Sequence, residues 1–197
     1  MSDRQKKRLR LLIVLGVLLL VNACAPWGSS TARLPKAMVE RQQWSHETSD
    51  LPPDPDTVYG RLPNGVRHIL KENRTPRDRV SMHLYIQCGS LAELPGEEGL
   101  AHFLEHMQFD GSTHFPPGEM VKYFQRIGMQ FGPDANAHTG FAQTVYDILL
   151  PKGDAQSIDE GLLVLSDYAQ GALLLPEQVE KEKKVVLAEK RSRDSAG

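Results

Sequence analysis

The stretch His102-Phe103-Leu104-Glu105-His106 decides how the rest of this chain is interpreted. On a helix, side chains four residues apart lie one above the other on the same face, so both imidazoles can reach one metal ion. The carboxylate of Glu105 shares that face and can accept a proton from a metal-bound water. The order H-x-x-E-H is the inverted form of the zinc-hydrolase pattern H-E-x-x-H. The pattern therefore predicts a helix that carries a catalytic zinc site.

Composition predicts an ordinary globular domain beside this site. The chain has 197 residues, of which 40% are hydrophobic and 24% charged, and its formal net charge is -2. These values provide enough apolar residues for one sizeable core. There is no basic surplus and no nucleic-acid-binding motif, so a nucleic-acid partner is not expected.

The N-terminus predicts export and lipid anchoring. A basic start is followed by the apolar run Leu11–Val21, which is too short to span a bilayer comfortably, so residues 1–23 are interpreted as a signal peptide. The ending Leu20–Cys24 resembles a bacterial lipobox, which predicts cleavage before Cys24 and acylation of its thiol. We then expect an outer-membrane lipoprotein that faces the periplasm. A short membrane anchor and an ordinary secretory signal are the alternatives.

Residues 24–56 are proline-rich and polar, which predicts a lipid-anchored tether that begins at Cys24. Residues 57–197 are the predicted folded domain. Cys88 lies in an apolar strand pattern and is expected to be a buried small hydrophobe. The expected strands are 58–62, 66–70, 80–88, 136–139 and 144–150, and the expected helices are 95–107, 120–127, 154–175 and 176–193. This order predicts an α+β fold with a largely antiparallel sheet covered by helices on one face.

The spacing of residues alone leaves the third metal ligand open. A catalytic zinc ion takes three protein ligands and keeps one position for water, and His102 and His106 provide two of the three. Glu182 and Glu189 stand two turns apart on the predicted last helix. A charged run of this kind is usually a solvated helix face, so the spacing does not choose between the two roles.

Several segments in a fixed order resemble the pitrilysin/insulinase family of zinc metallopeptidases. The segments are 99–107 with 109–112, 136–139, 144–146 and 182–189, and the resemblance extends from Val58 to Arg193. It implies a zinc metalloendopeptidase domain of the pitrilysin/processing-peptidase type, with one Zn²⁺ per domain. The expected substrate is a peptide or a small protein.

The resemblance also implies roles for the metal-site residues. Glu189 would be the third ligand beside His102 and His106, and Glu182 would orient a ligand from outside. Glu105 would be the general base that deprotonates the zinc-bound water.

The resemblance further implies that Asn136, Ala137 and Thr139 lie on an edge strand that pairs with the peptide substrate. His138 stands where an aromatic residue is common in the family. We expect it to be an exposed strand histidine and not a fourth ligand.

Members of this family combine such a domain with related ones to close a chamber around the peptide. The resemblance therefore implies that this chain is a piece of a longer protein or needs a second related domain or subunit. Alone, the chain would bind zinc but would cleave peptides poorly. The alternative is a non-catalytic scaffold or a partner-dependent subunit of the same fold.

Overall fold

The computed structural model describes residues 44–194, and the chain divides into two compact units between Asn73 and Arg74. The predicted signal peptide, Cys24 and most of the predicted tether lie outside the described residues. Within residues 44–194, no helix has the length and hydrophobicity needed to cross a bilayer.

The first unit contains the hairpin that the Asn-Gly turn predicts. Strands β1 (Thr57–Arg61) and β2 (Arg67–Lys71) pair antiparallel. The amide of Leu62 donates to the carbonyl of Val66 at 2.8 Å, and Gly65 adopts a positive φ of 90° in the short loop between them. Such a loop needs a residue without a Cβ at this position. The same unit holds the short helix η2 (Ser45–Glu47).

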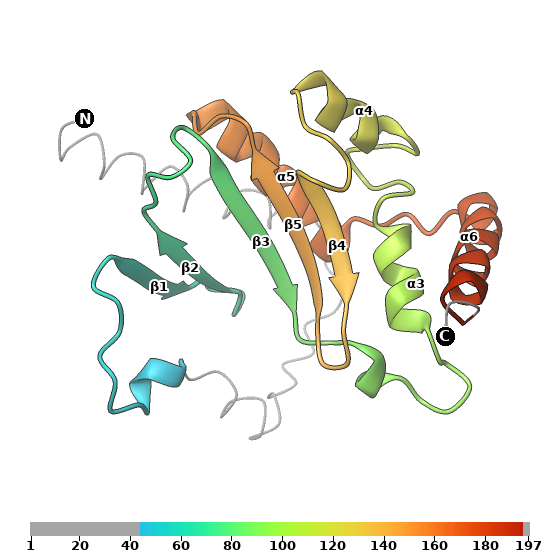
Figure 1. Cartoon of the computed structure of the whole chain (residues 1–197), viewed down its shortest axis with the longest axis horizontal. Coiled ribbons are helices and arrows are strands. Elements are labelled where there is room, and N and C mark those ends of the chain that lie inside the picture. The colour runs from blue at the N-terminus through green and yellow to red at the C-terminus, as the bar shows by residue number, and fades with distance from the viewer. Residues whose placement is uncertain (1–43, 195–197) are drawn as a thin grey trace. The chain divides into compact units, whose positions relative to one another are not determined.

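The second unit is built on a three-stranded antiparallel sheet in the order β3-β5-β4 (Figure 1). Helix α5 packs against β3 and β5, and α3 packs against both β4 and α6. The predicted α+β fold with an antiparallel sheet is confirmed. The elements of this unit are β3 (Val80–Ile86), η3 (Ser90–Ala92), α3 (Leu100–Met107), α4 (Glu119–Arg126), β4 (Ala135–Thr139), β5 (Thr144–Leu150), α5 (Ala155–Gln170) and α6 (Pro176–Asp194).

The two faces of this sheet differ in burial because side chains alternate along a strand. On β5, alternate residues beginning with Thr144 are buried, and Tyr146, Ile148 and Leu150 join the helices in the core. On the opposite face, Tyr85 of β3 is exposed. Helices therefore cover one face, as the pattern predicts.

Helix α3 begins five residues later than predicted. Gly96 and Gly99 have φ values of 94° and 91°, which a right-handed helix does not accept. Glu93 instead caps the helix: its carboxylate accepts hydrogen bonds from the amides of Gly99 at 2.9 Å and Ala101 at 2.8 Å. These bonds satisfy amides at the helix start, where a negative charge is also favourable.

Helix α5 ends at Gln170 and not at the predicted Leu175. A Cβ at Gly171 would stand 2.8 Å from the Cα of Asp167, so only glycine fits there, and Leu174 has a positive φ of 48°. The chain leaves the helix at this point and begins α6 at Pro176, a residue suited to the first helical position.

The predicted burial of Cys88 is wrong, since its side chain is exposed. Strand β3 ends at Ile86, and the amide of Cys88 donates to the carbonyl of Ile86 at 2.8 Å. The chain turns there, so the alternation of the strand no longer determines where this side chain points.

A buried carboxylate fastens the loop after α3 to α5. Asp167 is 2% exposed, and its Oδ2 accepts hydrogen bonds from the hydroxyl of Ser112 at 2.5 Å and the amide of His114 at 3.0 Å. The Nδ1 of His114 lies 2.7 Å from its Oδ1. This carboxylate thus fixes the segment that leaves the helix bearing the H-x-x-E-H motif.

We expect Asp167→Asn to lower the free energy of unfolding by about 2–3 kcal/mol, because an amide loses the charge that strengthens these hydrogen bonds. Urea unfolding followed by circular dichroism measures the change. Asp159→Asn, on the exposed side of the same helix, is the matched control. Equal midpoints for the two variants would contradict this role.

Candidate metal centre

Helix α3 carries the H-x-x-E-H motif and packs against β4 and α6. Glu105 and Met107 of this helix are buried, whereas Leu100 and Leu104 are exposed. Different sides of the helix can therefore face each of these two neighbours.

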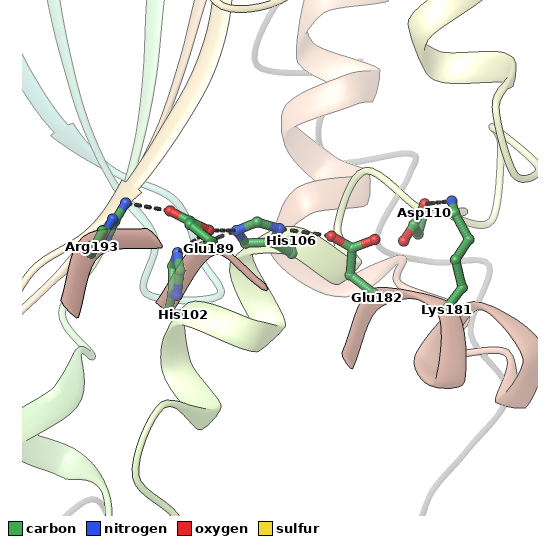
Figure 2. A network of polar contacts seen from close by, with 7 residues as sticks. All are labelled: His102, His106, Asp110, Lys181, Glu182, Glu189 and Arg193. Atoms are coloured by element: carbon green, nitrogen blue, oxygen red, sulfur yellow. Dashed lines mark hydrogen bonds and ion pairs between the residues drawn. The ribbon is translucent and has the colours of Figure 1, made fainter. Parts of the chain in front are cut away.

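Three ligand-type atoms from α3 and α6 converge at one point (Figure 2). The Nε2 atoms of His102 and His106 are 3.2 Å apart, and the Oε2 of Glu189 lies 3.8 Å and 3.4 Å from them, respectively. Ligands bound to a tetrahedral zinc ion at about 2.0–2.1 Å stand about 3.3–3.4 Å from one another. The triangle formed by these atoms therefore fits one face of a zinc tetrahedron, and the fourth corner is left for water.

Glu182 occupies a different position from Glu189. Its Oε1 lies 2.8 Å from the Nδ1 of His106, on the side of the ring away from the convergence point. Such a contact fixes the orientation and tautomer of an imidazole and leaves Nε2 free to bind a metal ion. The structure thus separates two glutamates that the spacing alone leaves equivalent.

Burial raises the pKa of the Glu182 carboxyl, which is 8% exposed. The neighbouring Asp110 raises the pKa further, whereas the contact with His106 lowers it. Asp110 itself pairs with Lys181 at 3.2 Å, as Figure 2 shows. The charges around His106 are therefore tied into a network that spans α6 and the end of α3.

Glu105 is 7% exposed and is not part of the triangle of ligand-type atoms. Its Oε2 accepts a hydrogen bond of 2.5 Å from the hydroxyl of Thr139 on β4. Burial raises the pKa of Tyr146, and the negative charge of Glu105 raises it further. The carboxylate is thus held next to the triangle by an element other than its own helix.

Strand β4 forms one edge of the three-stranded sheet and borders a cavity of about 740 Å³. Asn136, Ala137 and Thr139 line this cavity together with the convergent residues of α3 and α6. The exposed side chains of Phe131 and Phe141 also line it. The cavity is large enough for a short peptide segment, and its lining combines polar and apolar groups.

The remaining histidines of the described chain lie apart from the triangle. His138 is exposed, with 57% of its side chain accessible, as predicted. His83 lies 2.5 Å from Asp147 on the open face of the sheet, and His114 contacts Asp167.

Sequence reasoning missed Arg193. Its Nη2 pairs with the Oε1 of Glu189, and the residue lines the cavity. The spacing of four residues on one helix was the signal that could have revealed this pair.

Comparisons with known proteins show the family of this chain. The family model described as insulinase (peptidase family M16) matches residues 68–196. The probable zinc protease PqqL of Escherichia coli is 34% identical over 146 residues, which are 74% of this chain and 16% of that protein. The chloroplastic stromal processing peptidase of Arabidopsis thaliana is 33% identical over 144 residues, or 71% of this chain and 11% of the peptidase. The chain thus spans a small part of these relatives.

Two solved structures share the fold of this chain. The first half of the periplasmic protease PqqL from Escherichia coli superposes with a TM-score of 0.70 at 34% identity, covering 73% of this chain and 31% of that one. The ferredoxin protease FusC, crystallised as a mutant in complex with Arabidopsis ferredoxin, has a TM-score of 0.63 at 33% identity, covering 71% of this chain and 16% of that one.

We expect Glu182→Gln to weaken zinc binding by about 10–100-fold, because the imidazole of His106 loses the carboxylate that orients it. Competition with a chromophoric chelator measures the dissociation constant. Glu180→Gln, two residues earlier on the exposed side of α6, is the control. If both variants bind zinc as the unmodified chain does, Glu182 does not orient the site.

Proposed function

Because the chain belongs to the insulinase family (peptidase family M16), we propose that residues 57–197 form a zinc metalloendopeptidase domain that hydrolyses peptide or small protein substrates. The observation that carries the proposal is the convergence of His102, His106 and Glu189 beside a buried Glu105. This donor set of two imidazoles and one carboxylate is typical of catalytic zinc.

In this proposal His102, His106 and Glu189 hold one zinc ion, which when bound supplies a Lewis acid and lowers the pKa of a bound water. Glu105 would accept a proton from a water whose oxygen bonds to the scissile carbonyl carbon, and would donate a proton to the leaving amine as the C–N bond breaks. The hydroxyl of Thr139 donates to one oxygen of Glu105, so the other oxygen is available for the proton transfer.

The substrate is proposed to lie along β4. Ala135 at the start of this strand forms a bridge with Phe131, but no strand of the described sheet pairs with the outer edge beyond it. An extended peptide can add to such an edge through main-chain hydrogen bonds. Asn136, Ala137 and Thr139 would supply this edge. The peptide would then pass the zinc ligands in an extended conformation.

Full activity is proposed to need a second related domain or a partner subunit. This chain spans only 16% of the PqqL relative. The alternative of a non-catalytic scaffold would leave the buried position of Glu105 without a purpose, since a carboxylate is costly to bury.

We expect Glu105→Gln to retain zinc and to lose peptide hydrolysis by about 100-fold or more, because a general base contributes at least about that factor. The chain is assayed on a quenched fluorescent peptide, alone and with the remaining part of the protein. Glu119→Gln, at an exposed position of α4, is the control. Unchanged turnover in Glu105→Gln would favour the scaffold, and full activity from the isolated chain would remove the need for a partner.

We further propose that Cys24 is acylated and anchors the protein to the outer membrane, facing the periplasm. We expect Cys24→Ser to move the protein from the membrane fraction to the soluble fraction and to abolish incorporation of labelled palmitate. Cys88→Ser is the matched control, since Cys88 is the other cysteine of the chain. Membrane retention of the Cys24→Ser variant would refute lipid anchoring.

A further inference from the structure

We infer that Arg193 is a positioning residue that makes Glu189 bind the metal ion through one oxygen and thereby keeps the ion four-coordinate, with water as the fourth ligand. The inference rests on the proposed function of the same site. It concerns how many positions around the ion the protein occupies, which the identity of the ligands does not determine.

The two oxygens of Glu189 have different partners. Oε2 faces the imidazoles, at 3.4 Å from the Nε2 of His106 and 3.8 Å from that of His102, whereas Oε1 pairs with the guanidinium of Arg193 (Figure 2). Both residues lie on the same face of α6, four positions apart. The ion pair therefore engages Oε1 of Glu189 on the side away from the convergence point.

This division has a chemical consequence. A carboxylate can bind a metal ion through one oxygen or through both, and the second mode adds a fifth ligand beside the water. A guanidinium donates strong, directional hydrogen bonds to a carboxylate oxygen, so Oε1 is less available to the metal while Arg193 holds it. Two imidazoles and one oxygen then occupy three corners of the tetrahedron.

Arg193 can perform this task without being part of the core. Its side chain is 72% exposed and stands in the last described turn of α6. A substitution there removes the contact with Glu189 and leaves the packing of α6 against α3 in place. The neighbouring Arg191 is two positions from Glu189 and therefore faces another side of the helix.

The test replaces zinc with Co²⁺ in the full chain and records the visible absorption, which is several-fold stronger for four-coordinate than for five-coordinate Co²⁺. We expect Arg193→Met to reduce this absorption several-fold, with zinc affinity no weaker than in the unmodified chain. Arg193→Lys, which keeps a donor, should retain the four-coordinate spectrum. Arg191→Met should leave both measurements unchanged.

The outcomes separate this inference from the proposed function. If the unmodified chain binds neither Co²⁺ nor zinc, the metal site itself is refuted. If it binds both and Arg193→Met gives an unchanged spectrum, the site stands and the role of Arg193 is refuted. A fall in zinc affinity together with an unchanged spectrum would show that Arg193 merely stabilises the end of α6.

Discussion

The candidate site depends on how α6 lies against α3. Two imidazoles on one helix can be arranged by local geometry alone, but the third ligand-type atom belongs to Glu189 on α6, 83 residues after His106. The side of α6 that faces α3 carries Val179, Glu182, Val186 and Glu189, and of these four only Glu182 is buried. The contact is therefore held largely by polar pairs: Glu182 with His106, Lys181 with Asp110, and Glu189 with both imidazoles. Because such pairs are directional, they fix the rotation of α6 more tightly than an apolar stripe of this size would.

The same pairs concentrate negative charge in a small volume. Glu105, Glu182 and Glu189 all lie within or beside the cavity, and Asp110 lies close enough to Glu182 to raise its pKa. Burying carboxylates is unfavourable unless charge or hydrogen bonds compensate, and the two histidines and Arg193 compensate only in part. A divalent cation at the convergence point would remove much of the remaining repulsion. We therefore expect metal binding to stabilise the docking of α6 as well as to supply chemistry.

Sequence reasoning succeeded where the determinants are local. The periods of 2 and 3.6 located the strands and helices, and the H-x-x-E-H spacing placed His102 and His106 together. It failed at the start of α3, where Gly96 and Gly99 have positive φ values and Glu93 caps a later start, and at Cys88, where a turn interrupts the alternation of β3. Contacts between residues far apart in the sequence could not be predicted from local patterns. The spacing of Glu182 and Glu189 could not assign their different partners, and only the resemblance to a family distinguished them.

Thr139 links the two halves of the proposed chemistry. Its hydroxyl holds Glu105, and its main chain belongs to the edge strand on which a peptide would pair. A general base must lie within about 3 Å of the proton it removes, so a small displacement of β4 relative to α3 would move the substrate away from the base. The hydrogen bond between Thr139 on β4 and Glu105 on α3 opposes such a displacement. This arrangement requires the β4 edge to be ordered before substrate arrives, and the pairing of all five β4 residues with β5 supplies that order.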